Sequence, residues 1–204
     1  MCATTGYATA QAPARSVGIE DALANMHCLI VPGWQGSGAD HWQTFWQNRL
    51  PSASRVQVDS WDTPNKEDWV ASIDRALASV ERPVLLVAHS LGCPTIAHWA
   101  DTSSDQLHKV VGALLVAPAD VERSAAISTL RHFGPLPRKP LPFSTLLLAS
   151  DNDPTASIER ANQMAGWWGS EIYNLGHVGH INPAAGFNQW EEGLAWLKLL
   201  VRRC

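Results

Sequence analysis

The chain carries little charge. Asp, Glu, Lys and Arg make up 17% of its 204 residues, and the formal net charge at pH 7 is −4. Binding to nucleic acid or to an anionic membrane surface draws its affinity from clustered positive charge. We therefore expect neither nucleic acid nor a membrane as a partner. Composition does not determine the oligomeric state.

Long apolar runs and a targeting segment are also missing. No stretch approaches the roughly 20 consecutive apolar residues of a membrane-spanning helix. The first 25 residues, rich in Ala and Thr, lack the basic start and apolar middle of a signal peptide. We expect residues 1–25 to be a disordered extension. Residues 26–204 suit one domain, because their length allows one sizeable core and no change in composition marks a second.

Cysteine is scarce and lacks the spacing of a metal site. The four cysteines stand at positions 2, 28, 93 and 204, two of them near the termini. This usage predicts reduced thiols in a cytoplasmic protein. A glycine-rich segment at 33–38 lacks both the Lys-Ser/Thr ending of a P-loop and the spacing of a dinucleotide fingerprint. We expect no metal and no cofactor.

What the chain does contain is an alternation of strand-like and helix-like segments. Short apolar runs predict six strands, at 28–31, 55–58, 84–89, 110–117, 144–149 and 171–175. Amphipathic spacing predicts helices at 40–50, 65–80, from about 92, and at 121–131, 156–168 and 187–202. Strands that are apolar throughout and separated by helices indicate an α/β fold, with a doubly wound, mostly parallel sheet covered on both faces.

The connection between the fourth and fifth strands limits what can cover the sheet edge. Residues 118–143 provide one helix and a Pro-rich loop at 134–140. We therefore expect no large cap.

Ser90 is the candidate nucleophile. It follows the third strand in the sequence Ala88-His89-Ser90-Leu91-Gly92, which is typical of a nucleophile elbow except that alanine replaces the first glycine. In such an elbow the Leu91 N–H points at the developing oxyanion. Trp34, after Pro32-Gly33 in the loop that follows the first strand, is the candidate for the second donor. His89 should point away from the site, since adjacent strand residues face opposite sides.

An acid and a base follow in the order expected of a Ser-His-Asp triad on an α/β-hydrolase sheet. A serine hydroxyl needs a base, and histidine can accept and return a proton at neutral pH. His177 and His180 follow the sixth strand. Asp151 and Asp153 follow the fifth strand, and Asp120 at the end of the fourth is a rival acid.

Four segments together resemble a known family. They are Val-Pro-Gly-Trp-Gln-Gly-Ser-Gly-Ala-Asp-His-Trp (31–42), Ala-His-Ser-Leu-Gly-Cys (88–93), Ser-Asp-Asn-Asp-Pro (150–154) and Gly-His-Ile-Asn (179–182). In this order they are similar to the small serine hydrolases of the YdeN and retinoblastoma-binding protein 9 family, from about residue 27 to the C-terminus. The resemblance implies a compact, single-domain α/β-hydrolase fold and a triad of Ser90, Asp153 and His180. It also implies carboxylesterase or peptidase-like activity.

Tryptophan is abundant, with ten residues. Helical spacing predicts a core position for four of them, Trp42, Trp46, Trp190 and Trp196. Trp61 follows the second strand instead and is a candidate wall of the substrate pocket, as is Gln35.

The sequence thus predicts a cytoplasmic serine hydrolase that cleaves small carboxylic esters through an acyl-enzyme. Two alternatives stay open. One is an aminopeptidase or amidase on small acyl-amine substrates, for which Asp59 could bind the amine. The other is a non-catalytic protein-binding module, since fold alone does not determine function.

Overall fold

A single sheet of six parallel strands organises the chain. The structure, a computed structural model, describes residues 19–102 and 104–204. The strands are β1 (His27–Val31), β2 (Ala53–Arg55), β3 (Val84–His89), β4 (Val110–Val116), β5 (Ser144–Ala149) and β6 (Glu171–Asn174). Their order is β2-β1-β3-β4-β5-β6, and all five neighbouring pairs are parallel. The predicted α/β-hydrolase fold with a doubly wound sheet is confirmed.

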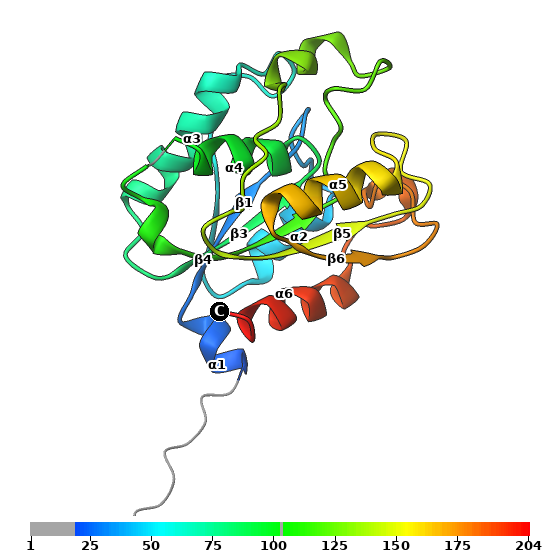
Figure 1. Ribbon diagram of the computed structural model, residues 1–204. Coiled ribbons are helices and arrows are strands. Elements are labelled where there is room, and N and C mark those ends of the chain that lie inside the picture. The colour runs from blue at the N-terminus through cyan, green and yellow to red at the C-terminus, as the bar shows by residue number, and fades with distance from the viewer. Residues whose placement is uncertain (1–18, 103) are drawn as a thin grey trace, which may run out of the picture.

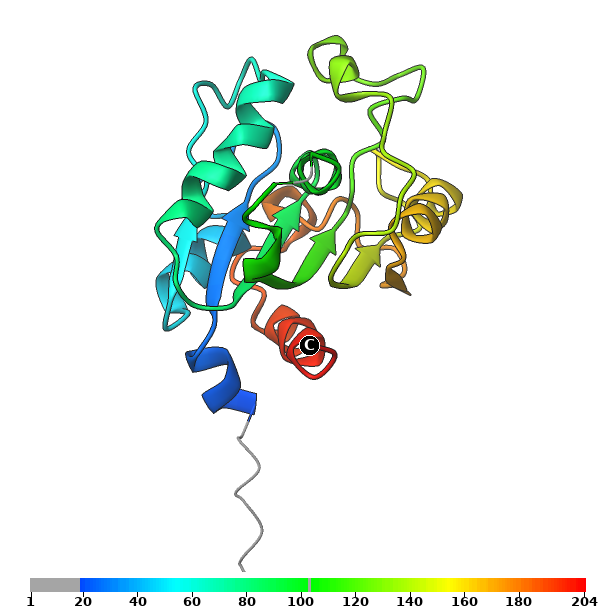
Figure 2. The same cartoon turned by 60° about the vertical axis from the view of Figure 1, so that its left-hand side comes forward.

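Helices cover both faces of this sheet (Figures 1 and 2). One face carries α3 (Lys66–Ala78), α4 (Gly92–Ala100) and α5 (Ile158–Trp168), and the other carries α1 (Ile19–Ala24), α2 (Trp42–Arg49) and α6 (Leu194–Val201). Within β3, Leu86 and Ala88 belong to the core on the first face, whereas Leu85 and Val87 belong to the core on the second. Burial on both faces explains why the central strands are apolar at every position.

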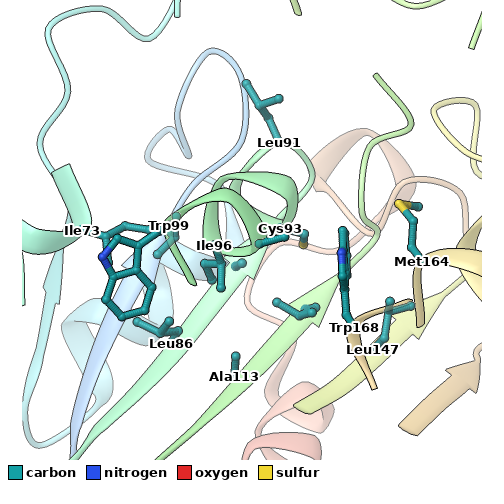
Figure 3. Packing of buried hydrophobic residues seen from close by; sticks show 14 of the residues in the cluster. Ile73, Leu86, Leu91, Cys93, Ile96, Trp99, Ala113, Leu147, Met164 and Trp168 are labelled. Atoms are coloured by element: carbon teal, nitrogen blue, oxygen red, sulfur yellow. The ribbon is translucent and has the colours of Figure 1, made fainter. Parts of the chain in front are cut away.

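Large side chains fill the first of these two layers (Figure 3). Trp99 from α4 and Trp168 from α5 are fully buried, and so is Ile73 from α3. Each buried aromatic side chain removes a large apolar area from water, so this layer holds α4 firmly against the sheet. The turn that leads into α4 carries the candidate nucleophile, which makes that rigidity important to the site.

The N-terminal boundary differs from the expectation. Residues 1–18 of the expected extension lie outside the described residues. Residues 19–24 of that same segment form α1, which packs against α6. Leu23 is 6% exposed within the core of the second face. The described fold therefore begins at Ile19 rather than near Met26, because Leu23 and Ala22 pack against the core of the second face.

Three predicted elements have other bounds. The second strand lies at Ala53–Arg55 rather than 55–58. In place of a helix over 121–131, the chain forms the 3-10 helix η2 (Ser128–Phe133). The last helix begins at Leu194, after the 3-10 helix η4 (Glu191–Gly193), because Trp190 takes a left-handed backbone conformation (φ 44°). Two further 3-10 helices are η1 (Leu107–Lys109) and η3 (Pro183–Ala185).

The predicted core tryptophans pack together on the second face. Trp42 and Trp46 are 0% and 1% exposed, as expected. Trp190 is partly buried and stacks on Trp46, with ring centroids 5.6 Å apart. Trp196 is partly buried beside Tyr173. None of the described helices combines the length and the apolarity that crossing a bilayer requires.

Candidate active site

Ser90 lies at a strained turn between β3 and α4. Its φ is 53°, a left-handed conformation that non-glycine residues rarely adopt. Two glycines allow the backbone to approach this turn. A Cβ on Gly33 would lie 2.7 Å from the Ser90 Cβ, and a Cβ on Gly92 would lie 2.2 Å from the Val31 carbonyl oxygen. Strain that the surrounding packing maintains is typical of a functional position.

The predicted base contacts Ser90, and the predicted acid contacts the base. The His180 Nε2 atom lies 3.0 Å from the Ser90 Oγ. The His180 Nδ1 atom lies 2.9 and 3.0 Å from the two carboxylate oxygens of Asp153. A carboxylate only accepts hydrogen bonds, so Nδ1 carries the proton and Nε2 is free to accept one from the serine. This arrangement can deprotonate a hydroxyl and stabilise the imidazolium that results.

Two loops hold the acid and the base. Thr155 donates to Asp153 Oδ1 from its N–H (2.7 Å) and from its Oγ1 (2.8 Å). His180 stands in a turn where Gly179 has a φ of 62° and Ile181 a φ of 48°. Thr155 is a site residue that was not predicted. The signal for it was present in Asp153-Pro154-Thr155, because an Asp commonly accepts a hydrogen bond from the backbone two residues on.

The rival acid and base residues have other partners. Asp120 pairs with Arg160, whose Nε lies 3.2 Å from its Oδ1, although Asp120 also lines the pocket beside Ser90. Asp151 is exposed and accepts from the Asn174 Nδ2 at 2.6 Å. The His177 side chain is 79% exposed. Within the described residues, these three side chains make no hydrogen bond to Ser90 or His180.

His89 does not point away from the site, contrary to the expectation. Its Nε2 donates to the His180 carbonyl oxygen at 2.8 Å, and the two rings lie 4.7 Å apart. His89 does face away from Ala88, but the loop after β6 passes over the face to which it points. Burial, followed by the nearby His180 and His41, holds the pKa of His89 well below its ordinary value. His89 is therefore a neutral side chain that supports the backbone of His180.

A pocket of about 350 Å³ opens beside Ser90. Its apolar wall comes from the segment after β4 and consists of Val121, Ala126, Ile127 and Leu130. Its polar side includes Gln35, His41 and Asn182. The Arg123 Nη1 donates to the Pro154 carbonyl at 2.5 Å and so ties the apolar wall to the loop that carries Asp153.

The two candidate oxyanion donors have different positions. Trp34 lines the pocket, and Leu91 directly follows Ser90 in the chain. Neither backbone N–H donates a hydrogen bond to another described residue. The Trp34 indole instead donates from Nε1 to the Asp62 carbonyl at 2.8 Å. The loop after β1 and the turn at Ser90 thus each contain one backbone N–H, that of Trp34 and that of Leu91, without a hydrogen-bond acceptor among the described residues.

The two candidate pocket residues have different positions. Gln35 lines the pocket. Trp61 does not, because its indole lies against Gly36 and Trp69. Its carbonyl accepts the Gln35 N–H at 2.9 Å, so Trp61 supports the loop after β1 from behind. Asp59 also lies outside the pocket.

The chain is similar to known serine hydrolases along most of its length. A family model described as serine hydrolase matches residues 28–199. The Bacillus subtilis protein YdeN, named as a hydrolase, is 26% identical over 168 residues, which are 78% of this chain and 87% of the relative.

Two solved structures of YdeN-like proteins are also similar to this chain. A YdeN-like hydrolase from Pectobacterium atrosepticum is 33% identical, with a TM-score of 0.78 over 89% of this chain and 94% of its own. The structure of the Bacillus subtilis ydeN product shares the fold, with a TM-score of 0.69 at 20% identity, over 86% of this chain and 98% of its own.

Proposed function

We propose, starting from the fact that this chain belongs to the serine hydrolase family that includes YdeN, that it hydrolyses small carboxylic esters through an acyl-enzyme on Ser90. The observation that carries the proposal is the continuous chain of contacts from Ser90 Oγ to His180 and from His180 to Asp153. A protein that only binds its partner has no need of this alignment.

In the proposed reaction, His180 Nε2 accepts the proton of Ser90 Oγ as the oxygen attacks the ester carbonyl carbon. The N–H groups of Trp34 and Leu91 bind the negative oxygen of the tetrahedral intermediate. Asp153 stabilises the imidazolium. His180 then gives its proton to the leaving alcohol oxygen, and the acyl group stays on Ser90. Water, deprotonated by the same histidine, releases the acid and restores the hydroxyl.

Pocket size and lining support a small ester as the substrate. A volume of about 350 Å³ suits a small molecule. The apolar wall at Val121 and Leu130 can receive an aliphatic acyl chain, because burying it there removes both surfaces from water.

We also place this activity in the cytoplasm. The thiols of Cys28 and Cys93 support that location, since both are free and buried rather than joined in a disulfide. Burial raises the pKa of Cys28 to about 12, so this thiol is inert as a nucleophile at neutral pH and leaves the chemistry to Ser90.

The test replaces the nucleophile. Ser90→Ala should abolish labelling by a fluorophosphonate probe and lower p-nitrophenyl acetate turnover by about 10³-fold or more, because the attacking oxygen is gone. Circular dichroism should show an unchanged fold. Undiminished turnover in this variant would overturn the proposal. A panel of p-nitrophenyl esters and aminoacyl anilides then tests the ester preference, and faster cleavage of the anilides would make the enzyme an amidase.

A further inference from the structure

One ring nitrogen of His41 makes a hydrogen bond that stabilises the start of α2. It is the N-cap residue of α2, and its Nδ1 accepts the N–H of Gln43 at 3.2 Å. A neutral imidazole whose Nδ1 accepts must carry its proton on Nε2. Burial, followed by the charges of Arg55 and His180, lowers the pKa of His41 to about 4. The ring is therefore a neutral donor of fixed tautomer at physiological pH.

The Nε2 donor of His41 is unused. It makes no hydrogen bond to another described residue. It is not sealed inside the protein either, since the described side-chain polar atoms that are buried and make no hydrogen bond belong to four other residues, Gln106, Thr145, Arg160 and Ser170. His41 is 7% exposed and lines the pocket beside Ser90. The opening available to Nε2 is the pocket.

The position of His41 indicates which part of a substrate it meets. The His41 and His180 rings both pack on the His89 ring, at 4.8 and 4.7 Å between centroids. In ester hydrolysis at Ser90, His180 passes its proton to the leaving alcohol, so the alcohol must lie beside His180.

The acyl chain has its own wall, away from His41. Val121 and Leu130 pack with the core that lies under α3, α4 and α5, whereas His41 precedes α2 on the opposite face. The apolar wall of the pocket thus comes from the segment after β4, which also contributes Asp120 and Arg123, whereas His41 lies beside His89 and His180.

We propose that the His41 Nε2–H donates a hydrogen bond to a second oxygen of the leaving alcohol, beyond the ester oxygen, and that the enzyme therefore selects esters whose alcohol part carries a hydroxyl or another oxygen acceptor. The proposal rests on ester hydrolysis at Ser90. An apolar alcohol would leave the donor without an acceptor in a partly desolvated site, and sites of this kind discriminate against analogues that lack the bonding group. His41 is thus a specificity residue of the reaction.

The experiment uses two nearly isosteric substrates, 2-hydroxyethyl butyrate and propyl butyrate. Both form the same butyryl-enzyme, so a difference in kcat/KM arises before deacylation, in binding or acylation. In the wild-type chain the hydroxyl ester should be preferred by about tenfold, the effect of one hydrogen bond.

Two variants separate the two nitrogens of the ring. His41→Asn keeps an N-cap acceptor for Gln43 and removes the pocket donor. The ratio of kcat/KM for the hydroxyl ester to that for the propyl ester should therefore fall to one or below, while the N-cap contribution to thermal stability remains. His41→Gln loses the cap but can place an amide N–H near the Nε2 position. We expect it to unfold at a lower temperature than His41→Asn and yet to retain more of the preference.

The outcomes are distinct. A preference that survives in His41→Asn, or that follows thermal stability across the two variants, overturns the role of His41. Equal kcat/KM for the two esters in the wild-type chain does so as well. Failure of the wild-type chain to hydrolyse either ester or to react with the fluorophosphonate probe would instead contradict the proposed esterase function, and with it this inference.

Discussion

At the scale of single residues, the choice between acids depends on what surrounds each carboxylate. Asp153 is nearly buried, with a side chain 4% exposed, and its Oδ1 accepts from both Thr155 and His180. Asp151, two residues earlier, is exposed and bonded to Asn174. Asp151 lies 3.7 Å from the exposed His177, whereas Asp153 faces His180, the histidine that contacts Ser90.

Asp153→Asn should lower kcat by about 10³ to 10⁴-fold. An amide cannot stabilise the imidazolium, and its N–H₂ group can force the wrong tautomer on His180. Steady-state hydrolysis of p-nitrophenyl butyrate measures the effect. Asp151→Asn is the matched control and should retain activity. Asp120→Asn, which alters a pocket residue paired with Arg160, should lower kcat less than Asp153→Asn does. An equal loss in either of these variants would show that the acid has been assigned to the wrong residue.

At the scale of elements, the position of Ser90 depends on the close approach of α4 to β1. Gly92 is the first residue of α4 and is fully packed beneath the loop that follows β1. The same contact brings the Trp34 amide near the nucleophile turn, because Trp34 lies in that loop. The helix, the strand and the candidate oxyanion donors are thus coupled through one glycine.

Gly92→Ala should destabilise the protein by about 3 kcal/mol or more, since the new Cβ would meet backbone oxygens that cannot rotate away. Urea unfolding followed by tryptophan fluorescence measures this loss. Gly166→Ala is the control. Gly166 lies within α5, and a Cβ there would meet nothing within 4 Å, so helix propensity should make this variant more stable by about 0.5 to 1 kcal/mol. Near-wild-type stability of Gly92→Ala would contradict the tight packing at the elbow.

At the scale of the whole molecule, the fold buries several histidines in neutral form. The described histidines with lowered pKa values are His27, His41, His89 and His98. Burial is the largest cause at each position. In the unfolded chain they take up a proton near their ordinary pKa of 6.5, whereas the folded chain resists protonation until a lower pH.

The free energy of unfolding should therefore fall as the pH drops below about 6.5, because the unfolded chain then binds more protons than the folded one. Above that pH these groups are neutral in both states and contribute no slope. His41 alone should contribute up to about 1.4 kcal/mol per pH unit until its folded pKa is reached.

Urea unfolding at about pH 7.5, 6 and 5 measures this slope. His41→Asn should show a shallower one, because it loses one of the groups that titrate differently in the two states. Equal stability at all three pH values in the wild-type chain would contradict the neutral burial of these histidines.

Local patterns along the chain determine much of the fold. The apolar run into Ser90 predicts β3 and the elbow, and Ser144–Ala149 has the expected bounds. A helix was predicted from residue 65, and Asn65 caps α3, where its side chain accepts the Asp68 N–H. These features depend on neighbours within a few residues, which is the range over which strand burial, capping and turns are decided.

What the sequence could not determine lies in the loops beyond the strands. Ser90 and His180 are 90 residues apart in the chain, and their contact depends on the path of the loop after β6. That same path places His89 in contact with His180, and the packing of Trp61 behind the loop after β1 keeps Trp61 out of the pocket. Which face of the sheet a strand side chain points to follows from the alternation of successive residues along the strand. The path of a loop depends instead on long-range packing and hydrogen bonds. The sequence by itself thus determined the sheet, the elbow and the order of the reactive residues. Spacing alone left two histidines and three aspartates open, and the family resemblance pointed to His180 and Asp153. Only the tertiary structure brings His180 to Ser90 and Asp153 to His180, because loops far apart in the chain must meet there.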